Sequence, residues 1–196
     1  YAHLLWHEPR VARHAFREDL DEVAWSTDAE AIEAWKAGRT GYPVVDAAMR
    51  QLLASGWMHN RARMIVASFL TKHLGVDWRV GEAHFMEHLV DGDPASNNGG
   101  WQWAASTGTD PQPYFRIFNP VLQGRKFDPD GEYVRHFVPE LAKLDARHIH
   151  APWEAGPEGL AQAGVILGET YPKPVVALAE GRARALVAYA SIRSAA

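Results

Sequence analysis

The densest group of residues able to hold a ligand lies between positions 91 and 103, where the chain reads Asp-Gly-Asp-Pro-Ala-Ser-Asn-Asn-Gly-Gly-Trp-Gln-Trp. Its glycines allow a flat molecule to approach the backbone, and its carboxylates and amides offer fixed hydrogen-bond partners. This combination suits a planar aromatic cofactor. The alternative is an elaborate turn between two helices, and the local residues alone do not separate the two interpretations.

A second motif with possible chemistry places two histidines one helical turn apart, with a glutamate between them. His84, Glu87 and His88 match the H-x-x-E-H pattern of inverted zinc peptidases. A third ligand would have to be a distant carboxylate, which the sequence does not identify, and so short a pattern also arises by chance. We therefore favour a helix surface with partly solvated histidines and predict no metal site, with a zinc hydrolase as a remote alternative.

Several other chemistries lack their motifs. The chain has no cysteine, which excludes disulfides and thiolate chemistry, and it has no phosphate-binding loop, dinucleotide-binding turn or serine elbow. No apolar run approaches the roughly 20 residues of a membrane span, and the first residues lack the layout of a signal peptide. These features predict a cytoplasmic protein without a membrane partner.

Charge restricts how the chain can bind nucleic acid. The net charge is −4, from 24 acidic and 20 basic side chains, which argues against binding driven by the charge of the whole domain. Any DNA contact must therefore be local. No acidic residue lies between Asp46 and Asp77, and the alternative to a cationic surface there is a chance gap. The stretch contains Arg50, Arg61, Arg63 and Lys72.

Capping residues and apolar spacing predict the helices that position these side chains. Thr27 or Asp28 caps a helix that reaches Gly38, and Pro43 fits the first turn of a helix that ends at Gly56. Asn60 caps a helix over 61–74, another helix covers 79–90, and Asp93 caps the next. The helix over 79–90 therefore ends, and the next helix begins, at the acidic turn formed by Asp91, Gly92 and Asp93.

The second half of the chain is less regular. After position 107, prolines punctuate short elements joined by long loops, until a last helix from Val175 to about Arg193. No convincing alternation of apolar and polar residues predicts a strand. We therefore predict an all-α fold, and the length of 196 residues with 47% hydrophobic residues suits one domain.

Five stretches, taken in order, resemble the signatures of the photolyase and cryptochrome family. They are residues 40–50, 57–64, 91–93, 97–103 and 114–120, so the resemblance runs nearly from end to end. It implies a class I cyclobutane pyrimidine dimer photolyase and assigns residues 1–196 to a truncated helical FAD-binding domain. The antenna domain, the upstream phosphate-binding helices and two upstream substrate contacts would be absent, and the start at Tyr1 fits a fragment.

The resemblance implies FAD as the cofactor and leaves the antenna pigment unknown. Asp91, Gly92 and Asp93 would line the flavin, Arg63 would pair with Asp91, and Asn97 would face the ring nitrogen that gains or loses a proton. Catalysis in the family uses the reduced anionic flavin, whose negative charge a nearby guanidinium stabilises.

The resemblance also assigns electron transfer to three tryptophans. Trp101 would lie nearest the flavin, Trp78 between, and Trp25 at the surface. Without the shared spacing, each would be interpreted as a core residue.

For the substrate, the resemblance assigns Asn60, Met64 and Trp103 to contact a flipped-out dimer, and Arg61 and Arg116 to contact phosphates. Asn60 has the alternative role of a helix cap.

The implied activity is that of a carbon-carbon lyase, a deoxyribodipyrimidine photo-lyase acting on DNA that contains pyrimidine dimers. We expect a monomer without a protein partner, and a fragment that alone binds flavin weakly and repairs poorly. A cryptochrome-type receptor is the alternative. Asn60 favours the dimer photolyase, because photolyases acting on (6-4) lesions usually carry histidine there, and Asn97 weighs against plant-type receptors.

Overall fold

The computed structural model describes residues 1–193, and within them it is helical with no β-strand beyond two isolated bridges. The predicted all-α fold is therefore confirmed. The α-helices are α1 (Ala2–His7), α2 (Ala29–Lys36), α3 (Pro43–Ser55), α4 (Asn60–Ser68), α5 (Trp78–His88), α6 (Pro94–Ala105), α7 (Pro120–Phe127), α8 (Glu132–Phe137), α9 (Gly156–Ala163) and α10 (Leu178–Arg193). No helix within the described residues is long and apolar enough to cross a membrane.

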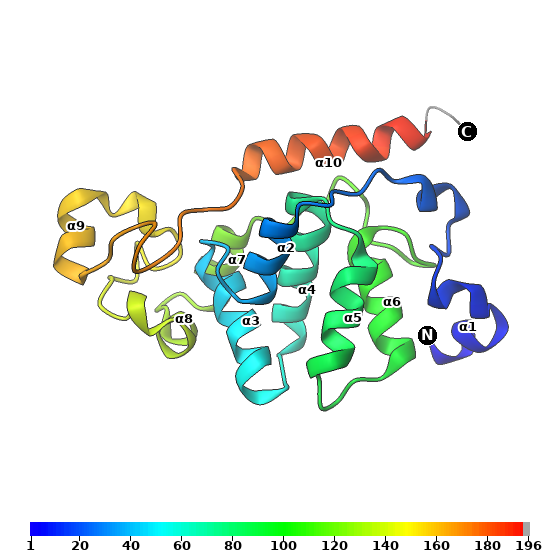
Figure 1. Ribbon diagram of the computed structural model, residues 1–196, viewed down its shortest axis with the longest axis horizontal. Helices are drawn as coiled ribbons and strands as arrows, with labels where there is room; N and C mark the ends of the chain where they lie inside the picture. Colours follow the sequence, from blue (N-terminus) through cyan, green and yellow to red (C-terminus); the bar gives the residue numbers. More distant parts are fainter. Residues whose placement is uncertain (194–196) are drawn as a thin grey trace.

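Four helices form the centre of the molecule. Figure 1 shows α3, α4, α5 and α6 running roughly alongside one another, with α10 lying across their ends and α8 and α9 to one side. Contacts join α3 to α4, α4 to α6, and α5 to α6. The largest apolar cluster fills this centre and includes the buried rings of Trp35, Trp78 and Trp101.

Most predicted helix ends are confirmed. The Asp28 carboxylate accepts a hydrogen bond from the Ala31 amide at 3.1 Å, and Asp93 accepts one from the Ser96 amide at 2.8 Å. Helix α3 begins at Pro43 and ends at Gly56, whose φ of 68° suits a residue without a β-carbon.

The prediction that Asn60 caps a helix over 61–74 is wrong in two respects. His59 is the cap, because its backbone is extended and its Nδ1 accepts the Arg61 amide at 3.1 Å, which leaves Asn60 as the first residue of the helix. The helix also widens into a π-helix over Phe69–Leu74. Within this stretch the Thr71 hydroxyl bonds the Ala67 carbonyl at 2.8 Å, a local contact that periodicity does not reveal.

The last helix begins three residues later than predicted. The Val175 amide donates a hydrogen bond to the Thr40 carbonyl at 2.9 Å, so this segment is tied to the start of α3 and the helix begins at Leu178.

Residues 40–50, the first of the five stretches that resemble the family, stabilise the fold. Asp46 is fully buried, and its carboxylate accepts hydrogen bonds from the Thr40 amide at 2.7 Å, the Thr40 hydroxyl at 2.6 Å and the Gly41 amide at 3.0 Å. The Tyr171 hydroxyl donates a further bond at 2.7 Å. Burial raises the pKa of Asp46, although these bonds act in the opposite direction. This carboxylate therefore joins the C-terminal half of the chain to α3.

Candidate functional site

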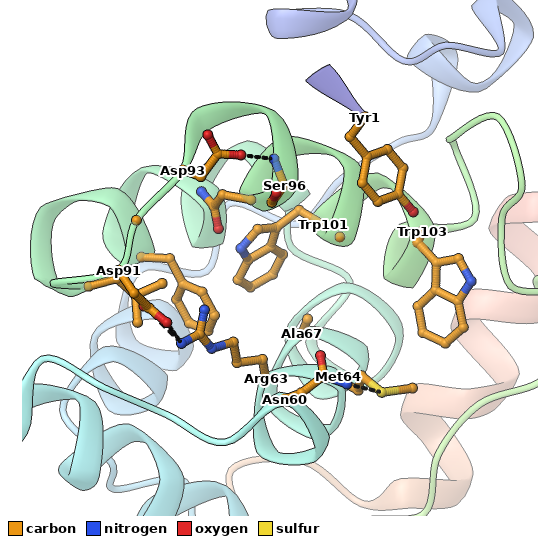
Figure 2. A pocket seen from close by; sticks show the side chains of 15 residues that line it. Tyr1, Asn60, Arg63, Met64, Ala67, Asp91, Asp93, Ser96, Trp101 and Trp103 are labelled. Atoms are coloured by element: carbon orange, nitrogen blue, oxygen red, sulfur yellow. Dashed lines mark hydrogen bonds and ion pairs between the residues drawn. The ribbon is translucent and has the colours of Figure 1, made fainter. Parts of the chain in front are cut away.

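A cavity of about 470 Å³ opens between α4 and α6, next to the turn that joins α5 to α6. Its volume falls in the usual range for small-molecule sites. Figure 2 shows side chains from these elements facing a common space. The predicted site residues that line it are Asn60, Arg63, Met64, Asp91, Gly92, Asp93, Asn97, Trp101 and Trp103.

Arg63 connects α4 to the acidic turn. Its Nη2 donates to both Asp91 carboxylate oxygens, at 2.9 and 2.8 Å, and its Nε donates to the Met58 carbonyl at 2.7 Å. Nη1 has no hydrogen-bond partner among residues 1–193. The ion pair thus holds a guanidinium at the cavity wall with donor capacity left for a ligand.

The two adjacent asparagines of α6 have different surroundings. Asn97 lines the cavity, and its Nδ2 donates to the Glu82 backbone carbonyl at 3.0 Å. Because a carbonyl only accepts, this bond fixes the amide nitrogen and leaves the Asn97 oxygen as a free acceptor. Asn98 is buried, donates to the Glu82 carboxylate at 3.2 Å and accepts from Gln102 at 3.1 Å. Asn97 is therefore available to a ligand, and Asn98 stabilises the packing.

The glycines show where a flat ligand fits. A β-carbon added at Gly100, which lines the cavity, would meet nothing within 4 Å, so the backbone there is open to close approach. A β-carbon at Gly99 would lie 2.1 Å from the Tyr1 ring, so that glycine serves packing. The open backbone, the guanidinium and the free amide oxygen together fit a planar, partly anionic ring.

The three predicted electron-transfer tryptophans belong to one apolar cluster but differ in exposure. Trp101 lines the cavity, Trp78 is fully buried, and Trp25 is half-buried and meets Tyr189 at a ring-centre distance of 6.3 Å. Among the described ring contacts, none joins Trp101 to Trp78 or Trp78 to Trp25. Trp101 instead meets Trp35 at 5.9 Å.

The predicted substrate residues separate into two places. Asn60 and Met64 lie one turn apart on α4, with the Asn60 amide 3.8 Å from the Met64 sulfur, and Trp103 lines the same cavity. Arg61 and Arg116 do not line it. Arg61 lies over the Phe127 ring, and Arg116 is exposed on the loop after α6.

The acid-free stretch supplies fewer available cations than its composition suggests. Arg50 forms an ion pair with Glu140 at 2.8 Å, and Lys72 is fully buried, where its ammonium bonds Ser106 at 2.8 Å. Arg63 is paired with Asp91, so Arg61 is the arginine of this stretch that has no carboxylate partner among the described residues.

The zinc-like motif lies outside the cavity. His84, Glu87 and His88 bring ligand atoms within 4.8 Å of one another, and none of the three lines the cavity. His84 is buried against Trp35, at 5.6 Å between ring centres, so its predicted partial solvation is wrong. Burial lowers its pKa to about 4. The His88 Nδ1 donates to the His84 carbonyl at 2.8 Å.

Sequence reasoning missed several residues of the cavity wall. Tyr1, Ala67, Phe85 and Leu89 also line it, as do Ser96 and Gly100 of the 91–103 stretch that the sequence had indicated as a ligand site. Phe85 and Leu89 lie four residues apart, so helical spacing predicts that they share a face of α5. It does not predict that the face borders a cavity.

Sequence comparison matches residues 1–191 to the family described as the FAD binding domain of DNA photolyase. This chain belongs to that family. It is 56% identical over 191 residues to a deoxyribodipyrimidine photo-lyase of Agrobacterium fabrum, covering 97% of this chain and 40% of the relative. The photolyase-family chain thus spans about 40% of the length of this relative.

Solved structures give the same family. A bacterial class III photolyase from Agrobacterium tumefaciens superposes with a TM-score of 0.95 at 55% identity, covering 98% of this chain and 40% of that one. A Synechocystis cryptochrome superposes with a TM-score of 0.82 at 39% identity, covering 95% and 40%. The family prediction is confirmed, while the choice between class I and class III is not settled by these similarities.

Proposed function

We propose that this chain forms the flavin-binding and DNA-binding part of a deoxyribodipyrimidine photo-lyase, a carbon-carbon lyase that uses light to split cyclobutane pyrimidine dimers in DNA. One observation carries the proposal. Arg63, Asp91 and Asn97, which lie far apart in the sequence, line one cavity together with Asn60, Met64 and Trp103. The residues assigned to the cofactor and to the substrate therefore share a single space.

In this proposal Arg63, Asp91, Gly92, Asp93 and Asn97 hold FAD. The bound reduced flavin supplies light-driven one-electron chemistry with no net redox change. The Arg63 guanidinium stabilises negative charge on the ring, and Asp91 orients that guanidinium through the paired hydrogen bonds. The Asn97 oxygen would accept a hydrogen bond from a protonated ring nitrogen, because the bond from Nδ2 to the Glu82 carbonyl orients the amide and leaves its oxygen without a partner among the described residues.

Substrate binding in this proposal uses Asn60, Met64 and Trp103 of the same cavity. Trp103 offers an aromatic face for an extruded pyrimidine dimer, Met64 a polarizable apolar contact, and Asn60 hydrogen bonds to base edges. Extruding two linked pyrimidines costs less free energy than extruding two normal ones, because the pairing and stacking of the damaged bases are already impaired. Arg61 and Arg116, outside the cavity, contact phosphates without sequence preference.

A cryptochrome-type receptor is not favoured, since the similar curated relative is named a photo-lyase, although a cryptochrome shares the fold. A zinc hydrolase would use His84, Glu87 and His88. Measurement of zinc in the purified chain tests that role, and a stoichiometric zinc content lost together with hydrolytic activity in His88→Ala would support it.

A chimera tests the photo-lyase directly. Residues 1–191 of this chain replace the matching segment of the Agrobacterium relative, and the product is assayed for light-dependent repair of a thymine-dimer oligonucleotide. We expect repair by the chimera, and loss of repair with flavin retained in Asn60→Ala. A chimera that folds and holds FAD but repairs nothing would contradict the proposal.

A further inference from the structure

An exposed phenyl ring lies beside Arg61, next to the residue that begins the cavity wall. Phe127, the last residue of α7, is 48% exposed. The Arg61 guanidinium lies 4.7 Å from its ring centre, and the Lys126 ammonium lies 5.3 Å from it. The Phe127 ring thus contacts two cations that come from different helices, Arg61 from α4 and Lys126 from α7.

These cations lack the acidic partners that neutralise their neighbours. Arg125, in the same turn of α7, forms an ion pair with Glu154 at 2.6 Å. Within residues 1–193, neither Arg61 nor Lys126 forms an ion pair with a carboxylate. A ring attracts a cation through its quadrupole without consuming its N–H donors. Both cations therefore keep their donors for an external anion.

Two stretches without acidic residues meet at the ring, although Asp128 follows Phe127 directly. Arg61 lies in the acid-free stretch 47–76, and Phe127 ends a second acid-free stretch, 111–127. The contact between Arg61 and Phe127 joins the two stretches. In a chain of net charge −4, this arrangement gathers two cations at one place, while the neighbouring Asp128 carboxylate accepts hydrogen bonds from the Tyr133 and Val134 amides.

The place adjoins the cavity. Asn60, which lines the cavity, immediately precedes Arg61 at the start of α4. Arg61 itself does not line the cavity, but a polyanion that it binds would lie within one residue of the cavity wall, as expected for the backbone of a nucleic acid strand with an extruded base.

We propose that Phe127 is a positioning residue, which holds Arg61 and Lys126 as a paired clamp for phosphates of the DNA backbone beside the cavity. The identity of the polyanion rests on the proposed function. The inference of a clamp depends only on the contact of both cations with the Phe127 ring. Arg61 and Lys126 supply the charge, and Phe127 acts through them by limiting the conformations of two long side chains before DNA binds.

The test measures binding of the full chain, with FAD present, to a fluorescein-labelled duplex with one thymine dimer, by fluorescence anisotropy over a range of salt. Phe127→Leu keeps an apolar side chain but removes the ring, and Phe127→Trp restores a ring. We expect Phe127→Leu to weaken binding about threefold and Phe127→Trp to restore it. Arg61→Gln should make the plot of log affinity against log salt concentration shallower, reducing the magnitude of its slope by about 1.

A double-mutant cycle separates positioning from general damage to the fold. In a background of Arg61→Gln and Lys126→Gln, the change Phe127→Leu should have no further effect on affinity. Lys143→Gln, which removes an exposed lysine elsewhere, controls for net charge. Equal losses from Phe127→Leu in both backgrounds, or no loss in either, would overturn the clamp.

Failure of the proposed function would look different. Equal affinity for damaged and undamaged duplexes would contradict the assignment to dimer repair. Coupling between Phe127 and the two cations would still support the clamp in that case, because it needs only backbone phosphates.

Discussion

The indole of Trp101 occupies the space that a side chain at Gly81 would fill. Atoms of its ring lie 2.1 to 2.6 Å from the position of a β-carbon built on Gly81. Helices α5 and α6 therefore approach closely at this point, and the missing side chain of one helix fixes the ring of the other. Because Trp101 lines the cavity, this contact also shapes the site.

Gly81→Ala should consequently displace Trp101. We expect a loss of about 1 to 3 kcal/mol in the free energy of unfolding, measured by urea denaturation, because the new methyl group overpacks a buried contact. Gly100→Ala is the matched control, since its methyl group meets nothing within 4 Å. That control should leave stability unchanged or raise it slightly, while reducing FAD binding, because Gly100 lines the cavity. Equal stability of the two variants would contradict the packing explanation.

Asn97→Asp should destabilise the chain more than Asn97→Ala. The aspartate cannot donate to the Glu82 carbonyl when ionised, and it places a negative oxygen 3.0 Å from that carbonyl if the side chain keeps its position. We expect Asn97→Asp to lower the free energy of unfolding by about 1 to 3 kcal/mol, measured by urea denaturation at neutral pH. The alanine variant loses only one hydrogen bond, worth about 1 kcal/mol, and a larger loss for alanine than for aspartate would refute this account.

Trp78→Phe should abolish light-driven reduction of bound flavin and leave flavin binding intact, if the three tryptophans carry electrons. Phenylalanine fills much of the same buried space but is far harder to oxidise than indole. The measurement is the bleaching of oxidised flavin under blue light with an external reductant. Trp6→Phe, at an 83% exposed position, is the control and should behave as the unaltered chain. Normal photoreduction in Trp78→Phe would exclude it from the route.

Lys72 should make stability depend on pH. Its ammonium is buried beside the Ala105 carbonyl, the Ser106 hydroxyl and the Tyr189 ring, and burial lowers the pKa of Lys72 well below its usual value of 10.5. Between the lowered and the usual pKa the unfolded chain binds more protons, so the free energy of unfolding should rise as pH rises through that window.

Lys72→Met should remove this dependence. The comparison of urea midpoints for the two chains is made below about pH 9, where tyrosines remain protonated. We expect the difference in stability between the unaltered chain and the variant to shift in favour of lysine as pH rises. A difference that stays constant with pH would show that Lys72 keeps an ordinary pKa.

Local signals in the sequence located most helices, because caps and glycine ends depend on residues close in the chain. Asp28, Asp93 and Gly56 are examples. The choice of His59 over Asn60 as a cap depended on a ring nitrogen that propensities do not anticipate. The burial of Lys72 was also hidden, because its partners lie more than 30 positions away, at separations of 33 and 34 residues.

Residue types alone indicated the 91–103 stretch as a ligand site, but the inclusion of Arg63 depended on the resemblance. Nothing in the spacing of Arg63 and Asp91, which are 28 positions apart, indicates a contact between them. Once the signatures had suggested both residues, the structure placed them on one cavity, but it also revealed Tyr1 and Phe85, for which the signatures gave no signal. Long-range packing, which periodicity does not encode, accounts for the difference.

The ion pair between Arg63 and Asp91 is partly open to water, with side-chain exposures of 27% and 47%, and exposed pairs of this kind contribute little to stability. A molecule seated between α4 and α6 would add contacts to the apolar packing that already joins these helices. At a concentration one hundred times its dissociation constant, such a ligand adds about 2.7 kcal/mol. The midpoint of thermal unfolding should therefore rise with the concentration of free FAD.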